Sequence, residues 1–174
     1  NTTASNNTAV GALALEANTT GAANTAVGAT ALDAATTANY NVGIGYAALT
    51  ATTTGADNTA VGSGAMEANT TGDDNTAVGR AALQANTTAS DNTAVGSQAG
   101  DAITTGASNT LLGRNAGGAL TTGNNHVHIG DTAGDAMTTT SNSVAIGYGA
   151  LTASTVSDAL TAVGHQAMTA NTTG

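Results

Sequence analysis

A motif of 17 residues repeats along this 174-residue chain without one insertion or deletion. One unit of this size cannot bury its own apolar face, so consecutive units must pack against one another. A disordered low-complexity tract would be expected to drift in repeat length. The constant register therefore predicts a solenoid and favours an extended structural or adhesive element over an enzyme. The glycines that end the NTAVG-like blocks mark the register: Gly11, Gly28, Gly45, Gly62, Gly79, Gly96, Gly113, Gly130, Gly147 and Gly164.

The repeat makes residues 1–174 a single solenoid of ten coils, and the positions of a coil are numbered 1 to 17 from its first residue. The chain opens in the middle of a repeat, so we expect it to be an excerpt of a longer fibre. The anchor, tip and export signal of that fibre are then expected to lie outside this sequence. The coils begin at residues 7, 24, 41, 58, 75, 92, 109, 126, 143 and 160.

The composition argues against an ordinary globular core. The chain has no Phe, Trp, Pro or Cys and only three Tyr, so the large side chains that usually fill an interior are missing. We expect a thin interior lined by Ala, Val, Thr, Leu and Ile. The absence of proline suits backbone ladders along the whole length, because proline cannot donate to a ladder.

The charge balance excludes some partners. Two basic residues stand against eleven acidic ones, for a net charge of −9. Nucleic-acid binding needs phosphates to be neutralised by Lys and Arg, so no nucleic-acid partner is expected, and an anionic membrane surface is disfavoured for the same reason. No stretch approaches the roughly 18 apolar residues of a membrane span, so we expect no membrane insertion in this segment.

Positions 2 to 4 of each coil predict one short strand. Thr or Val at position 2 and Val, Ile or Leu at position 4 alternate with a smaller residue, as in Val42 and Ile44 around Gly43. This pattern indicates a strand with one buried face, which we expect to carry positions 2 and 4. Position 3 also accepts Leu111 and His128, so we expect it to face a roomier place on the other side of the strand.

Positions 7 to 12 predict a tight or helical turn. Alanine at positions 8 and 11 of every coil would share one face of a helical turn. Position 9 is Leu or Met in seven coils and Gly in three, and in those three position 12 becomes large. The exchange suggests that both positions share one pocket, which one large side chain fills. The exchanged pairs are Gly100 with Ile103, Gly117 with Leu120, and Gly134 with Met137.

Positions 13 to 17 have the composition of corners, with paired Thr followed by Gly, Asn, Asp and Ser. Stacked coils place identical residues above one another, so the asparagines from Asn7 to Asn109 and the threonines of position 13 form ladders. Such ladders can exchange hydrogen bonds from coil to coil. At the usual strand spacing, ten coils give a rod about 48 Å long.

The segment NSVAIG at residues 142–147 resembles the head repeat of trimeric autotransporter adhesins, the YadA-like β-roll. The other units, NTAVG followed by ALxANTTG, resemble a longer variant of that repeat in bacterial surface proteins and phage tail fibres. The resemblance implies a left-handed parallel β-roll assembled as a homotrimer, exposed on a cell or virion and used for attachment. Apolar residues at positions 4, 8, 9 and 11 exceed what one thin core needs, which independently favours lateral association.

His126 and His128 are the candidate metal ligands. Residues i and i+2 of a strand point to the same face, so the two imidazoles should project together. Around a trimer axis six imidazoles would converge, which suits a divalent transition metal and resembles the HxH iron sites of trimeric phage fibres. The alternative is a pair of exposed histidines without a ligand.

A row of carboxylates occupies position 17 of three successive coils, at Asp57, Asp74 and Asp91. Carboxylates stacked at about 4.8 Å repel one another, and a hard cation such as calcium would relieve the repulsion. The glycine and aspartate spacing of calcium-binding β-rolls is absent, so a solvated acidic corner is the better interpretation.

The sequence thus favours a structural and adhesive repeat segment of an extracellular fibre: a bacterial adhesin, an extracellular filament or a phage tail fibre. We expect it on a cell or virion surface, acting as a stiff multivalent rod. The expected partners are further copies, as a homotrimer or filament, and a host-surface receptor or glycan. The alternative is an ice-binding solenoid, because Thr ladders on a flat face can order water. The paired Thr are expected at a corner, which argues against that alternative. We expect no enzyme, because no set of residues forms a credible catalytic group.

Overall fold

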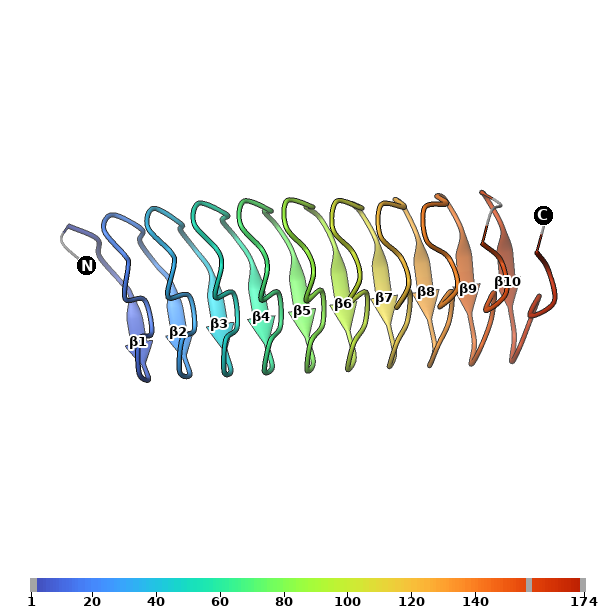
Figure 1. The fold of residues 1–174 in the computed structure, drawn as a ribbon, viewed down its shortest axis with the longest axis horizontal. Coiled ribbons are helices and arrows are strands. Elements are labelled where there is room, and N and C mark those ends of the chain that lie inside the picture. Colours follow the sequence, from blue (N-terminus) through green and yellow to red (C-terminus); the bar gives the residue numbers. More distant parts are fainter. Residues whose placement is uncertain (1–2, 156–157, 173–174) are drawn as a thin grey trace.

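The computed structural model describes residues 3–155 and 158–172, and those residues form a parallel β-solenoid without a helix (Figure 1). Every strand is three residues long and occupies positions 2 to 4 of its coil. The strands are β1 (Thr8–Val10), β2 (Thr25–Val27), β3 (Val42–Ile44), β4 (Thr59–Val61), β5 (Thr76–Val78), β6 (Thr93–Val95), β7 (Thr110–Leu112), β8 (Val127–Ile129), β9 (Val144–Ile146) and β10 (Thr161–Val163).

The ten strands make one sheet in which each strand pairs in parallel with the next strand along the chain. The partner of every strand residue is the residue 17 positions on, as Thr59 pairs with Thr76. The strands lie side by side in one row along the long axis of the molecule, with β1 and β10 at its opposite ends (Figure 1). The all-β solenoid expected from the repeat is confirmed.

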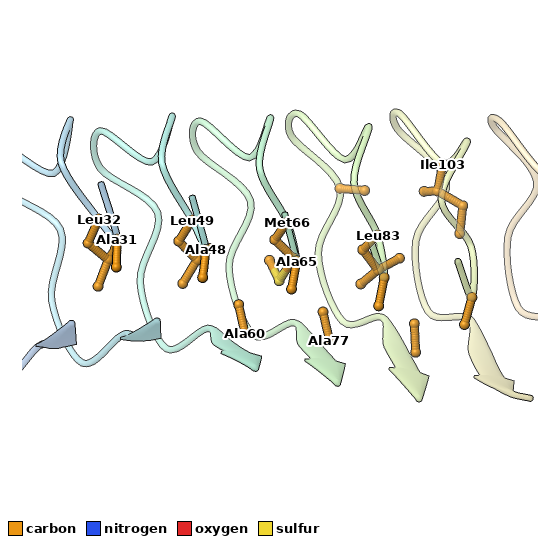
Figure 2. Close-up of a cluster of buried hydrophobic side chains, with 14 of the residues drawn as sticks. Ala31, Leu32, Ala48, Leu49, Ala60, Ala65, Met66, Ala77, Leu83 and Ile103 are labelled. Atoms are coloured by element: carbon orange, nitrogen blue, oxygen red, sulfur yellow. The ribbon is translucent and has the colours of Figure 1, made fainter. Parts of the chain in front are cut away.

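The expected orientation of the strands is wrong. Position 3 faces the interior, where Ala60 and Ala77 are fully buried, and positions 2 and 4 face outward. The interior is so thin that the sheet lies directly against the opposite side of the coil, and only a small residue fits there in most coils (Figure 2). The β-branched residues therefore stand on the outer face of the sheet.

Positions 5 to 12 form consecutive tight turns instead of a helical turn. In the first coil the N–H groups of Ala14, Glu16 and Asn18 each donate to the carbonyl three residues earlier, at 3.4, 3.3 and 3.2 Å. Positions 7 and 9 have positive φ in every coil, including bulky residues such as Leu32 at 53°. Positive φ at the third residue is characteristic of type II turns. The tight form of the expected turn is thus confirmed.

The apolar core lies between these turns and the sheet. Between the two end coils, position 8 alanines and position 9 leucines or methionines are buried in a row, shown by Leu32, Leu49 and Met66 in Figure 2. Position 11 alanines are only partly buried, as at Ala68, so the expectation that positions 8 and 11 share a buried face is wrong. The turn is not helical, so a spacing of three residues does not bring the two alanines onto one face.

The exchange between positions 9 and 12 is confirmed, and it includes a third position. Ile103, which accompanies Gly100, is fully buried. A Cβ at Gly100 would lie 2.6 Å from Leu111 Cδ1, and one at Gly134 would lie 2.3 Å from the His128 ring. The glycines therefore make room for large residues at position 3, while position 12 refills the remaining space.

Two side-chain ladders join the coils. Asn75 Oδ1 accepts the Asn92 N–H at 3.0 Å, and Asn75 Nδ2 donates to the Ala89 carbonyl of its own coil at 2.8 Å. The same pattern links each asparagine from Asn7 to Asn109. At position 13, Thr70 Oγ1 donates to the Thr87 carbonyl at 2.9 Å, and other coils repeat this bond. The expected bonding from coil to coil is confirmed.

Candidate functional site

The imidazole of His126 takes the place of an asparagine in the ladder. The backbone N–H of His126 donates to Asn109 Oδ1 at 3.0 Å, and the ring Nε2 lies 2.6 Å from the Thr140 carbonyl oxygen. Its Nδ1 accepts the Ser143 N–H at 3.3 Å. This arrangement requires the neutral tautomer with hydrogen on Nε2, because Nε2 must donate and Nδ1 must accept. Ser143 Oγ then accepts the Leu160 N–H at 3.3 Å, so the ladder continues through the histidine.

His128 occupies position 3 and lies inside the coil. It is fully buried, and neither ring nitrogen has a hydrogen-bond partner. Its ring rests on the backbone of Gly134, where a Cβ would collide with it. The apolar core runs from Leu15 to Leu120 and begins again at Ala133, so the two imidazoles interrupt it.

Burial, together with the smaller effect of the neighbouring His126, lowers the pKa of His128 from the ordinary value of 6.5 to about 3. Burial also lowers the pKa of His126, while its bonds to the Thr140 and Ser143 backbones and the charge of Asp158 act in the opposite direction. Between pH 6.5 and about 3, the unfolded chain binds a proton at His128 that the folded chain does not. The folded state therefore loses stability as the pH falls below 6.5.

The two histidines lie together, as expected, with ring centroids 4.8 Å apart, but they do not reach an outer face. A metal on an axis between chains needs exposed rings, so the expected convergence of six imidazoles is wrong for this fold. Both nitrogens of His126 are already engaged in the ladder. Within residues 3–155 and 158–172, no three His, Cys, Asp or Glu residues gather as a metal site. Metal binding by His126 and His128 stays a prediction.

The acidic row lies at an exposed corner, with the side chains of Asp57, Asp74 and Asp91 in solvent. Asp73 beside it accepts the Ala56 N–H at 2.7 Å, so this carboxylate bonds to the backbone of the neighbouring coil. This placement agrees with a solvated corner.

The outer face of the sheet is the largest regular surface of the solenoid. Position 2 contributes a row of mainly Thr and position 4 a row of Val, Ile and Leu, and both rows are partly or fully exposed. Val78 is 36 % exposed and Leu112 is 47 % exposed. Because the strands stay in register, the rows follow the sheet from β1 to β10 (Figure 1).

The two edges of this face carry the larger polar and aromatic side chains. Position 17, just before each strand, holds Tyr40 and the acidic row, and position 6, just after it, holds Tyr46 and Arg80. Arg80 donates to the neutral Gln98 Oε1 at 2.9 Å. In the described part of the chain the one ion pair joins Arg114 to Asp131 at 2.9 Å, also at position 6.

Sequence reasoning missed this outer face, because positions 2 and 4 were assigned to the interior. A signal was present: Leu111 and His128 at position 3 occur in coils whose position 9 is Gly, at Gly117 and Gly134. Two positions that exchange volume in this way share one interior.

Comparison of the sequence with models of protein families, with curated proteins and with solved structures finds no match. The described residues contain no helix long and apolar enough to cross a bilayer. They also form no pocket, so the outer face and the histidine pair remain the two candidate sites.

Proposed function

We propose that this chain is a structural and adhesive rod segment of an extracellular surface fibre, such as a bacterial adhesin, an extracellular filament or a phage tail fibre. The observation that supports this most directly is the unbroken ladder from Asn7 to Leu160, which joins all ten coils. The buried polar side chains of the ladder bond each coil to the next along one axis. A fold built in this way resists bending and extension along that axis.

The bonds between neighbouring coils support this mechanical role. Between the coils that begin at residues 58 and 75, Thr59 N–H donates to the Asn75 carbonyl at 2.8 Å and Met66 N–H to the Ala82 carbonyl at 3.0 Å. The asparagine and threonine ladders add side-chain bonds to these. Each bond contributes about 1 kcal/mol, and the bonds on one interface break together when coils separate.

The repeated outer surfaces suit multivalent attachment. Each coil presents the same polar corner at the same spacing, so a receptor or glycan bound weakly by one coil can be bound by several. The likeness of residues 142–147 to adhesin head repeats agrees with a place on a cell or virion surface. The proposal assigns the chain no catalytic role.

Immunogold labelling of intact source cells or particles tests this proposal. Antibodies are raised against the folded chain, and those that bind the exposed corners are used. Labelled filaments or fibres on the surface are expected. Labelling confined to the interior of opened cells would contradict the proposal.

Ice binding is the second candidate, and the outer face supports it. Thr59, Thr76, Thr93 and Thr110 form an uninterrupted row of partly or fully exposed hydroxyl and methyl groups on consecutive strands. This row lies on the sheet, not at the corner where the paired Thr are found. Thermal hysteresis at high protein concentration tests the candidate, and its absence would remove it.

A further inference from the structure

The outer face has the dimensions of a protein interface. Ten strands of three residues at the usual spacing give a face of about 48 Å by about 10 Å. A second surface of the same kind laid on it would bury about 1,000 Å² in total, which is the smallest area expected of a specific interface. The ten strands lie side by side in one row along the rod, so a second such row can be laid along it (Figure 1).

The centre of this face is apolar and uncharged. The position 4 row places a Val, Ile or Leu on every strand, and five of these, including Val10 at 57 % and Ile44 at 39 %, are well exposed. A continuous apolar row along the whole rod is unusual for an isolated chain and marks a surface that another molecule covers.

The only tyrosines of the chain flank this row. Tyr40 and Tyr46 lie at the two ends of β3 and are 64 % and 65 % exposed, and Tyr148 follows β9. Tyr40 has φ of 56°, a conformation that costs a residue with a Cβ about 1 kcal/mol and that Asn or Asp adopts more easily. Tyrosines are enriched in protein interfaces.

The charges on the two edges restrict how a second copy can lie. The edge before the strands carries Asp57, Asp74 and Asp91, and the edge after them carries Arg80 and the ion pair of Arg114 with Asp131. If two rods lie face to face and antiparallel, each acidic edge faces the other acidic edge. If they lie parallel, related by a two-fold axis along the rod, the acidic edge of one copy faces the Arg80 edge of the other.

In the parallel arrangement the same coils oppose one another. Asp74 and Arg80 flank the same strand, β5, so each Asp74 meets the Arg80 of the second copy. Tyr40 and Tyr46 flank β3, so each Tyr40 likewise meets the second copy's Tyr46. The Val, Ile and Leu row of each copy then lies against the Thr row of the other copy, with the two sheets about 10 Å apart as in stacked sheets. The interface is self-complementary, as a two-fold interface must be.

We propose that the outer face binds a second copy of this chain, giving a parallel dimer in which the two sheets pack face to face in register. The dimer deepens the proposed fibre function and rests on it for its biological role, because a paired rod is stiffer than a single one. Dimerisation itself is tested separately from the position of the fibre on a surface.

Sedimentation equilibrium of the purified chain is the first test. The expected mass is twice the 16.4 kDa of one chain. Val78→Asp puts a carboxylate at the centre of the face without entering the core, and we expect it to weaken association at least about 100-fold, since a two-fold axis buries two such charges. The matched control Thr71→Asp adds the same charge at an exposed corner off the face and should leave the dimer intact.

The edge charges test the orientation. Arg80→Asp should weaken association about tenfold, and the exchange Asp74→Arg with Arg80→Asp should restore it, because the opposed pair is rebuilt with reversed signs. Circular dichroism of each variant verifies that the solenoid is folded. A monomer for the unaltered chain, a trimer, or a dimer unaffected by Val78→Asp would overturn the proposal. A monomeric rod that still labels surface fibres would overturn the dimer alone and leave the proposed function in place.

Discussion

Asn75 lies in the middle of the ladder, and its replacement by alanine measures what the ladder contributes. Its Oδ1 accepts the Asn92 N–H at 3.0 Å, and its Nδ2 donates to the Ala89 carbonyl at 2.8 Å and the Asp73 carbonyl at 3.0 Å. Nδ2 also lies 3.1 Å from Asn58 Oδ1. All four contacts disappear in Asn75→Ala.

The consequences differ among these partners. The Asn92 N–H is buried and keeps no other acceptor, whereas the Ala89 carbonyl still accepts from Asn86 Nδ2 at 3.1 Å. At about 1 kcal/mol for each net bond, and more for an orphaned buried donor, Asn75→Ala should lower the free energy of unfolding by about 3 kcal/mol.

Replacing a ladder asparagine by histidine instead of alanine provides a matched comparison. His126 shows that histidine can make the ladder bonds with its two ring nitrogens. A Cβ at Gly123, three residues earlier, would lie 2.8 Å from His126 Nε2. The residue three positions before Asn75 is Gly72, but the residue three positions before Asn92 is Ala89. Asn75→His should therefore cost about 1 kcal/mol and Asn92→His about 3 kcal/mol, since only the second imidazole meets a methyl group.

Urea denaturation followed by circular dichroism gives these differences, and hydrogen exchange shows whether the amide of residue 92 loses protection. Repeat solenoids can unfold in parts, so the exchange data locate the loss. Equal stabilities for Asn75→Ala and the unaltered chain, or Asn92→His as stable as Asn75→His, would refute the role assigned to the ladder.

The neutral histidines and the packing exchange give the remaining predictions. Lowering the pH from 7 to 5 should reduce stability by about 2 kcal/mol through the depressed pKa of His128. His128→Leu should remove most of that dependence in urea titrations, whereas His165→Gln, at an exposed position, should leave it. Gly100→Leu should lower the melting temperature sharply because its Cβ meets Leu111, and adding Ile103→Asn and Leu111→Ala should recover most of the loss by restoring the commoner packing. A triple variant no more stable than Gly100→Leu would disprove the shared interior.

The period of the repeat predicted the stacking, the strands, the register and the ladders, because these depend only on identical residues recurring at a fixed interval. It did not predict which face of the strand is buried. Thr and Val at positions 2 and 4 have the hydrophobicity of interior residues, whereas the small residues at position 3 gave no apolar signal. The thin interior reverses the usual pattern, since it has room for Ala60 and not for Val61.

The histidine pair shows the same limit at one site. Sequence spacing placed His126 and His128 on one side of the chain, and the structure brings them together. Spacing alone could not distinguish an outer face from an interior one. The role of His126 was readable from its place in the asparagine row, because its two ring nitrogens can accept and donate as an amide does.

Force spectroscopy on a single chain held at both ends tests the rod most directly. The chain should extend little until whole coils separate abruptly, and each released coil should add about 60 Å of contour length. The lengths gained should be multiples of this step, because the ladders of one coil interface break together. Smooth extension at low force, as for a flexible polymer, would contradict the proposal that this solenoid is a stiff structural element.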